Sequence, residues 1–112
     1  MPSNHKRGVW AEYIAVFILL CKGYRILKLR AKTPVGEIDI LVSKHNTLIA
    51  VEVKTSHSYD HASHKIDTRK KKRVTDALNW IRTQNNYTHY NSFRFDGFII
   101  AQRRFYHIMD AW

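Results

Sequence analysis

The chain has 112 residues, a length that suits one domain with a modest core. Hydrophobic residues make up 45% of it and charged residues 25%, a balance that argues against an intrinsically disordered chain. The formal net charge of +10 favours a polyanionic partner, either nucleic acid or an anionic membrane surface, with a basic solvated surface as the alternative. The single cysteine, Cys21, precludes an intramolecular disulfide and fits a reducing cytoplasm.

A first helix is expected from about Lys6 to Lys22, ended by Gly23. Its apolar run is shorter than the ~20 residues of a membrane span, and no small-residue cleavage site follows, so neither a membrane segment nor a signal peptide is expected. Spacings of three and four residues predict one apolar stripe in a well-buried helix. The stripe consists of Trp10, Tyr13, Ile14, Phe17, Ile18 and Cys21, with Cys21 as a buried structural thiol rather than a nucleophile.

Three short β-rich runs follow, at 24–29, 36–42 and 48–55. Pro34 separates the first two runs, and the polar turn at 43–46 joins the second to the third. Short links between consecutive strands predict an antiparallel meander.

The polar segment at 56–67 contains His57, His61 and His64. On a helix their spacing of four and three would cluster them, so a zinc site is conceivable. Because no cysteine accompanies them and no helix signal supports them, a mobile loop beside the strands is the better interpretation.

A second helix is predicted from Thr68 to Asn85, with Val74, Ala77, Leu78 and Ile81 as its apolar face. It begins with five bases in a row: Arg69, Lys70, Lys71, Lys72 and Arg73. Cations at a helix N-terminus oppose the helix dipole, so the block either binds phosphates or is a solvated charge run. A strand at 93–101 and a short strand or tail at 103–112 follow, with Tyr106, Ile108 and Met109 available for the core. This order predicts one α/β domain over residues 1–112.

The alternation of side chains along strands brings Asp39, Glu52 and Lys54 to one side of the sheet. Mg²⁺ needs only one or two carboxylates beside waters and substrate phosphate, so Asp39 and Glu52 are candidate ligands, with the Val53 carbonyl as an extra oxygen. A metal-bound water is a better nucleophile at neutral pH, and Lys54 would orient it or stabilise charge on the phosphate. The alternative is an ion-pair ladder on the exposed face of a sheet, because an acid with a lysine two residues on is a weak motif.

The pattern extends along nearly the whole chain. In order it comprises Gly8 with Glu12, Gly23-Tyr24, Gly36-Glu37-Ile38-Asp39, Val51-Glu52-Val53-Lys54, the lysine block before Val74 and Ala77, Arg94-Phe95-Asp96, His107-Ile108 and Ala111-Trp112. This series resembles the YraN-like bacterial family of predicted endonucleases in the PD-(D/E)xK superfamily, distantly similar to archaeal Holliday junction resolvases. The resemblance implies a restriction endonuclease-like core, with a mixed sheet of four or five strands flanked by helices in the order α-β-β-β-α-β-(β).

The resemblance also assigns roles to single residues. Asp39 and Glu52 become metal ligands and Lys54 the catalytic lysine, while Glu12 becomes an additional acid, either a further metal ligand or a group that orients water. Lys70 corresponds to a basic residue near the scissile phosphate. Arg30 and Lys32 depart from the asparagine and arginine usual before the glycine-glutamate motif, and Ser56 replaces a usual arginine, which puts the substrate contacts in question.

The expected function is therefore a Mg²⁺- or Mn²⁺-dependent endonuclease acting on DNA in the cytoplasm, with a preference for structures such as branches or flaps. Arg30, Lys32 and the block at 69–73 would bind backbone phosphates, which give position rather than sequence information. Resolvase-like nucleases often pair two sites, so a homodimer is compatible with the resemblance. One alternative is a nucleic-acid-binding module without catalysis. Another is an interaction protein whose basic helix meets an acidic partner.

Overall fold

The structure, a computed structural model, describes residues 4–56 and 68–112, with side chains described for 9–55 and 68–112. The elements are α1 (Asn4–Cys21), β1 (Arg25–Thr33), β2 (Gly36–Lys44), β3 (Thr47–Ser56), α3 (Thr68–Arg82), the 3-10 turn η1 (Asn85–Tyr87), β4 (Ser92–Ala101) and β5 (Arg104–Ile108). In the described residues the strands form one five-stranded sheet in the order β1-β2-β3-β4-β5. β3 and β4 are parallel, and the other neighbours are antiparallel.

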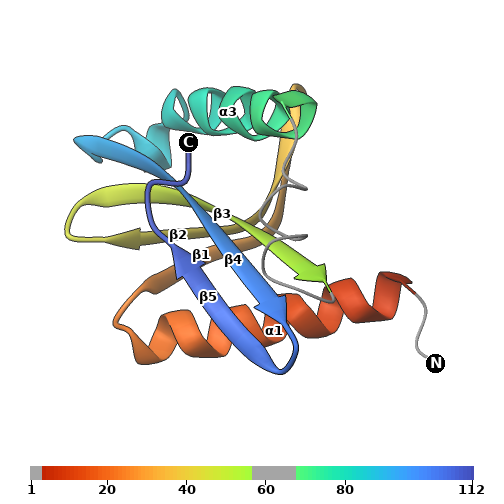
Figure 1. Ribbon diagram of the computed structural model, residues 1–112. Coiled ribbons are helices and arrows are strands. Elements are labelled where there is room, and N and C mark those ends of the chain that lie inside the picture. The colour runs from red at the N-terminus through yellow and green to blue at the C-terminus, as the bar shows by residue number, and fades with distance from the viewer. Residues whose placement is uncertain (1–3, 57–67) are drawn as a thin grey trace.

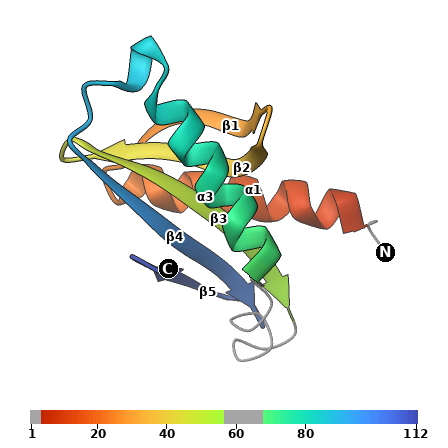
Figure 2. The same ribbon diagram turned by 90° about the horizontal axis from the view of Figure 1, so that it is seen from above.

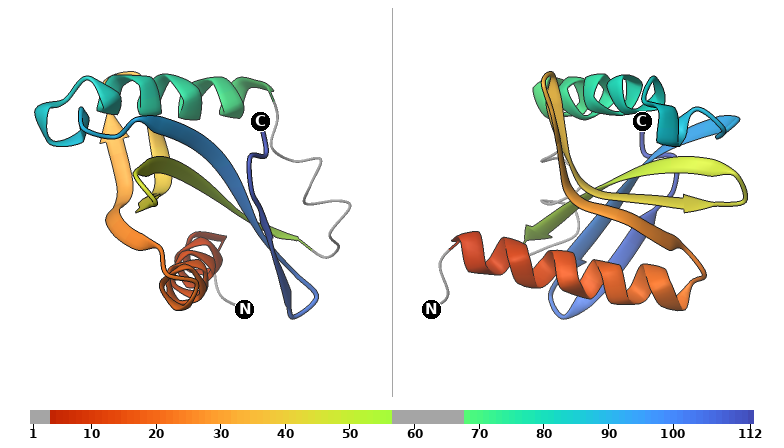
Figure 3. Two further views of the ribbon diagram at one scale, coloured as in Figure 1. Left: turned by 90° about the vertical axis from the view of Figure 1, so that its left-hand side faces the viewer. Right: turned by 180° about the vertical axis from the view of Figure 1, so that it is seen from behind.

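The two helices cover opposite faces of this sheet, α3 on one side and α1 on the other (Figure 1). The core under α3 contains the predicted helix face of Val74, Ala77, Leu78 and Ile81, packed on residues of the meander. The core under α1 contains residues of β2 and β3 with Phe98 of β4. Figure 3 shows the three layers, with α1 seen end-on beneath the sheet in the left-hand view. The predicted mixed sheet and element order are confirmed, and both are consistent with the restriction endonuclease-like core.

The predicted orientation of α1 is wrong. Its buried positions are Ala11, Ala15 and Leu19, whereas Trp10 and Phe17 are each 68% exposed. Tyr13, Ile14, Leu20 and Cys21 are exposed as well, so Cys21 is not a buried thiol. The periodicity misled because this helix is apolar on all sides, so spacing alone does not identify the inner face. Alanines on the inner face allow the helix axis to lie close to the sheet.

The meander is confirmed, with a tight turn at His45 and Asn46, both at positive φ. β1 extends to Thr33, four residues beyond its predicted end, because it pairs with β2 up to Thr33↔Gly36. At the C-terminal end, Met109 was predicted for the core but is exposed. Among the described residues, no helix is long and apolar enough to span a membrane.

Strands β2 and β3 separate partway along their length. They pair from Lys44↔Thr47 up to Ile40↔Val51. Beyond that point β2 pairs with β1 alone, while β3 continues beside β4 to Ser56. In Figure 2, seen from above, the β1–β2 hairpin and the end of β3 diverge beneath α3. The residues immediately after the last paired position are Asp39 and Glu52.

Candidate active site

Asp39 and Glu52 lie at the point where β2 and β3 separate, which we call the fork. Their carboxylates accept hydrogen bonds from backbone N–H groups that strand pairing no longer satisfies there. The backbone N–H of Val53 donates to Oδ2 of Asp39 at 2.9 Å. The backbone N–H of Asp39 in turn donates to Oε1 of Glu52 in a longer contact of 3.4 Å. Buried backbone donors need partners, and here the carboxylates supply them across the opening. The two acids that sequence alternation placed on one side of the sheet are therefore brought together by the structure.

The alternation of side chains along β2 is interrupted at Asp39. Ile38 packs in the core under α3, whereas Ile40 and Val42 pack in the core under α1. Alternation along residues 36–42 predicts from the sequence that these three side chains share one face, because successive side chains of a regular strand point to opposite faces. That prediction is wrong for Ile38. Asp39 itself lies on the side of α3, as does Leu41 two residues later, and it lines a pocket with residues of that helix.

The position of α3 over the fork depends on a close backbone contact at Gly36. A Cβ placed on Gly36 would lie 2.0 Å from the carbonyl oxygen of Arg73 and 2.9 Å from its carbonyl carbon. No real Cβ tolerates such a distance from backbone, so glycine is required where the β1–β2 hairpin meets the helix. This contact sets how closely the first turns of α3 approach Asp39 and Glu52.

Glu52 is a buried acid whose partner is a lysine from α3. Its side chain is 1% exposed, and Lys70 Nζ lies 3.0 Å from its Oε2. The ammonium and the carboxylate form an ion pair. Burial and the neighbouring charge of Asp39 raise the pKa of Glu52 to about 7, against the opposing effect of Lys70. Glu52 is thus the acid in the site most strongly perturbed by its surroundings.

Lys54 and Lys70 form the cationic half of the same cluster. Burial lowers the pKa of Lys54, and the adjacent Lys70 lowers it further. For Lys70 burial also acts to lower the pKa, but Glu52, Lys54 and Asp39 together outweigh it and raise the pKa above its ordinary value. The cluster therefore keeps Lys70 positively charged, and it makes Lys54 the easier of the two lysines to deprotonate.

A cavity of about 380 Å³ opens over Asp39, Glu52 and Lys70, and Lys54 is not part of its lining. It is lined by Glu37, Asp39, Glu52, Arg69, Lys70, Arg73 and Val74. The acids come from the fork, and the bases come from the first turns of α3. The pocket thus has acids on its strand side and basic side chains on its helix side. Such a pocket suits an anionic substrate that contacts the basic side chains and a metal ion bound to the acids.

The remaining predicted residues divide into those near the pocket and those elsewhere. Of the basic block, Lys71 and Lys72 do not line the cavity, and Lys72 pairs with Asp76 at 2.8 Å on the surface of α3. Glu12 of α1 pairs with Arg30 of β1 at 3.0 Å. In the part of the chain with described side chains, no three His, Cys, Asp or Glu groups gather as metal ligands, so Glu12 is not part of such a group with Asp39 and Glu52.

The histidines of the predicted zinc alternative, His57, His61 and His64, lie outside the described residues, as does the predicted loop they belong to. Lys32, predicted to contact phosphate, is an exposed residue of β1. The structure therefore tests neither the zinc alternative nor the predicted phosphate contact of Lys32.

The residues at the fork fit a hard divalent cation. Two carboxylates from adjacent strands are the donor set that Mg²⁺ uses when waters and a phosphate complete its shell. The ammonium of Lys70 lies 3.0 Å from the buried Oε2 of Glu52, so this oxygen already has a positive charge beside it, at a position that a metal cation could take instead. Glu52 and Asp39 would hold the ion, with the Val53 carbonyl as a predicted further oxygen.

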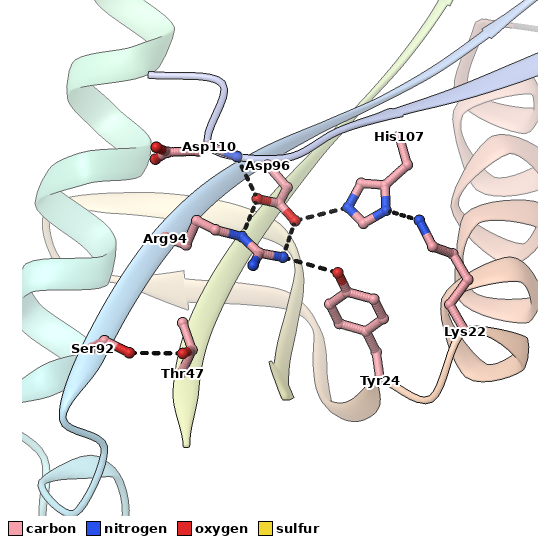
Figure 4. A network of polar contacts seen from close by, with 8 residues as sticks. All are labelled: Lys22, Tyr24, Thr47, Ser92, Arg94, Asp96, His107 and Asp110. Carbon is pink, nitrogen blue, oxygen red and sulfur yellow. Dashed lines mark hydrogen bonds and ion pairs between the residues drawn. The ribbon is translucent and has the colours of Figure 1, made fainter. Parts of the chain in front are cut away.

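A second polar cluster, which the sequence analysis did not identify, lies at β4 and β5 (Figure 4). Asp96 is fully buried and accepts two hydrogen bonds from Arg94, at 2.7 and 2.8 Å. His107 Nε2 lies 2.7 Å from Oδ2 of Asp96, and the Asp110 N–H donates to Oδ1 at 3.0 Å. Arg94 also donates to the hydroxyl of Tyr24 at 2.9 Å. The cluster ties the C-terminal hairpin to the start of β1.

In the sequence these residues stand out only as parts of the family motif series, in Gly23-Tyr24, Arg94-Phe95-Asp96 and His107-Ile108. The Arg94-x-Asp96 spacing also places two of the side chains on one face of a strand. His107 comes from the next strand, and Lys22 at the end of α1 contacts its Nδ1. Burial alone would raise the pKa of Asp96, but the bonds from His107, Arg94 and the Asp110 backbone lower it overall. Asp96 is therefore a structural carboxylate rather than part of the pocket.

The fold and the site define an α/β protein with a mixed sheet, in which paired carboxylates at a strand fork lie under a basic helix. The chain belongs to the family described as "Uncharacterised protein family UPF0102", whose model matches residues 11–100. This confirms the family predicted from the motifs.

Related proteins, each named UPF0102 protein, match over most of their length. The Bradyrhizobium sp. (strain BTAi1) protein is 38% identical over 99 residues, which cover 88% of this chain and 72% of the relative. The Nitrobacter winogradskyi protein is 39% identical over 87% of this chain and 82% of its own length. The Parvibaculum lavamentivorans protein is 37% identical over 98% of this chain and 84% of its own length.

Proposed function

We propose that this protein is a divalent-metal-dependent endonuclease of the PD-(D/E)xK superfamily that hydrolyses DNA phosphodiester bonds. The observation that carries the proposal is the meeting of Asp39 and Glu52 at the strand fork, under the cationic start of α3. A structural ion pair alone would not need a second acid beside Glu52, since that acid raises the cost of keeping Glu52 ionised.

Each group in the site has a role under this proposal. Asp39 uses one oxygen to hold the Val53 backbone, which fixes its carboxylate relative to Glu52 and leaves its other oxygen for a cation. Mg²⁺ or Mn²⁺ held by these acids would lower the pKa of a water and neutralise charge on the phosphate. Lys54, with its lowered pKa, is suited to orient the attacking water or to take up its proton. An ion held by Glu52 would take the place of the Lys70 ammonium, which would then be available to contact the phosphate.

The substrate contacts favour DNA structure over DNA sequence. Arg69 and Arg73 line the pocket beside Lys70, so three cations face a backbone that carries one charge per phosphate. Phosphate contacts set position and orientation without reading bases. Branched or flapped DNA, in which the backbone is exposed and bent, is therefore the expected substrate. The single cysteine is compatible with the reducing cytoplasm in which this activity would take place.

The test is a titration of Mg²⁺ and Mn²⁺ against linear, flapped and four-way DNA, with a chelator control. Asp39→Asn keeps the shape of the side chain but removes its charge, and Glu37→Gln makes the same kind of change in the same pocket outside the proposed pair. We expect cleavage that requires metal, is lost in Asp39→Asn and persists in Glu37→Gln. Metal-independent cleavage, or full activity in a folded Asp39→Asn protein, would refute the proposal.

A nucleic-acid-binding module of the same fold is the second candidate. It is favoured by one observation: Lys70 already neutralises Glu52, and the described side chains include no group of three acids, histidines or cysteines that could hold a metal ion. Binding of this kind would survive chelation and would weaken steeply with salt. Shifted DNA bands without cleavage in either metal would select this alternative.

A further inference from the structure

The outer face of α1 is an uncovered apolar surface. It consists of Trp10, Tyr13, Ile14, Phe17 and Leu20, which recur at spacings of three and four and so lie on one side of the helix. Trp10 and Phe17 are each 68% exposed, and Tyr13 is 61% exposed. In the left-hand view of Figure 3, α1 lies at the outside of the molecule, with the sheet on one side only. Among the residues with described side chains, five of the ten exposed large hydrophobic residues belong to this one face.

The size of the face matches a small specific interface. Three aromatic side chains of about 150–250 Å² each, exposed by roughly two thirds, present about 300–500 Å² before Ile14 and Leu20 are added. Single exposed apolar residues are ordinary, but a contiguous patch of this size marks a contact surface. Two such faces packed together would bury roughly 1,000 Å² in total, the lower range of specific protein interfaces.

The small number of charged residues on this face limits which partners can bind it. From Val9 to Cys21 the helix contains one charged residue, Glu12, and its charge is already paired with Arg30 of the same chain. Between Val9 and Cys21, the part of the helix with described side chains, a polyanion or an acidic protein would find no free cation on this face. A second copy can meet it without placing like charges opposite each other, even though each copy carries a net charge of +10.

We propose that two copies of the chain associate through the outer faces of their α1 helices, to form a two-fold dimer with the pockets under α3 on its outer sides. An isologous interface needs a surface that complements itself, and a charge-free stripe of interleaved aromatic and aliphatic residues meets that requirement. Because α1 and α3 cover opposite faces of the sheet, the dimer leaves the proposed active site open. The inference does not depend on the proposed nuclease activity.

The test is sedimentation of the full chain over a concentration series from about 1 to 200 μM, where a small apolar interface is expected to show association. We expect a monomer–dimer equilibrium that holds or tightens when NaCl is raised from about 0.1 to 0.5 M, since salt screens the repulsion between two basic copies. Phe17→Glu should weaken association by about tenfold or more, because the substitution places a charge at the centre of the face.

Met109→Glu is the matched control. It makes the same change of charge at an exposed apolar residue on another part of the surface, and it should leave the dimer intact. Both variants lower the net charge, so general repulsion between copies does not explain a difference between them. Their unfolding midpoints should equal that of the parent protein, because both side chains are exposed.

Two results would overturn the proposal. One is a protein that remains monomeric throughout the series. The other is association that Phe17→Glu and Met109→Glu weaken equally. Flotation with vesicles of zwitterionic and of anionic lipid examines the competing occupant, a membrane surface. A monomer in solution that binds vesicles through Phe17 would assign the face to lipid instead of a second copy.

Discussion

The ammonium of Lys70 lies 3.0 Å from Oε2 of Glu52, a carboxylate that is almost completely buried. Lys70 thus neutralises the acid at the position where a metal ion would be held, and a cation that binds there must replace it. This ion pair offsets the energetic cost of burying the Glu52 carboxylate beside Asp39. It also joins the two halves of the pocket, the strand fork and the first turn of α3.

Replacing Lys70 should tighten metal binding under the proposed function. In Lys70→Ala a divalent cation no longer competes with an ammonium for Glu52, so Mn²⁺ should bind about five- to tenfold more tightly at pH 8.5, above the pKa of about 7 that Glu52 has in the parent protein. Calorimetric titration measures the affinity. Lys72→Ala removes the same charge from the same helix at an exposed surface pair and serves as control. Equal affinities in both variants would show that Lys70 does not compete for the site.

The raised pKa of Glu52 predicts a distinctive dependence of stability on pH. Between its ordinary value of 4.5 and about 7, the folded protein binds a proton that the unfolded chain releases. Stability from this group is therefore fully present below pH 4.5 and falls as the pH rises through 7. A shift of this size corresponds to about 3 kcal/mol.

Glu52→Gln removes this dependence. We compare the free energy of unfolding of Glu52→Gln with that of the parent protein, without metal. The difference, variant minus parent, should rise by about 3 kcal/mol from pH 5 to pH 8, because only the parent loses stability over this range. Urea unfolding in the presence of a chelator measures the difference, in which other titrating groups cancel. Glu37→Gln, at the rim of the same pocket, should show no comparable trend. A difference between Glu52→Gln and the parent that is the same at both pH values would contradict the assignment of the shift to Glu52.

The contact between Gly36 and α3 predicts that one methyl group disturbs the pocket. In Gly36→Ala the new Cβ would meet the backbone of Arg73 rather than a flexible side chain, so the helix must move away from the hairpin. We expect a loss of about 1–3 kcal/mol in the free energy of unfolding, typical of overpacking. Nuclease activity, if present, should fall further than stability, because Lys70 and Arg73 move with the helix. Val35→Ala, an exposed change in the same turn, should have little effect on either quantity.

The sequence predicted those parts of the fold that depend on local pattern. The meander follows from alternation and short turns, and the inner face of α3 was correct because that helix has one apolar stripe, at Val74, Ala77, Leu78 and Ile81. The same method failed for α1 because that helix carries apolar residues on all of its sides. Its buried side was decided by which residues allow close approach to the sheet, and these are Ala11 and Ala15 rather than the aromatic residues.

The candidate site was predicted in its residue types but not in its geometry. Alternation placed Asp39 and Glu52 on one side of the sheet, yet the fork that brings them together forms where β2 stays paired with β1 and β3 stays paired with β4. That competition involves strands far apart in the sequence. The pairing of Glu12 with Arg30 is likewise a contact between distant elements, a helix and an edge strand, for which the sequence carries no local signal.

The buried cluster around Asp96 predicts a large effect on stability away from the pocket. Asp96→Asn leaves Arg94 and His107 without their common carboxylate inside the protein, and breaking such a buried pair costs about 3 kcal/mol or more. Because the pKa of Asp96 is lowered in the fold, this stabilisation is present above the ordinary carboxyl pKa of 3.8 and is lost as the pH falls through the lower folded value. Urea unfolding at pH 7 and pH 3 should therefore show a smaller effect of the substitution in acid.

Asp76→Asn provides the comparison, since it removes an exposed partner of Lys72 and should cost less than about 1 kcal/mol at either pH. If Asp96→Asn were as mild as Asp76→Asn, the hydrogen bonds around Asp96 would contribute nothing to holding β5 against the rest of the sheet. If the predicted loss is seen while binding of Mn²⁺ at the fork is unchanged at a temperature where the variant is folded, the two acid clusters have separate roles. One then maintains the sheet, and the other is free to serve the pocket.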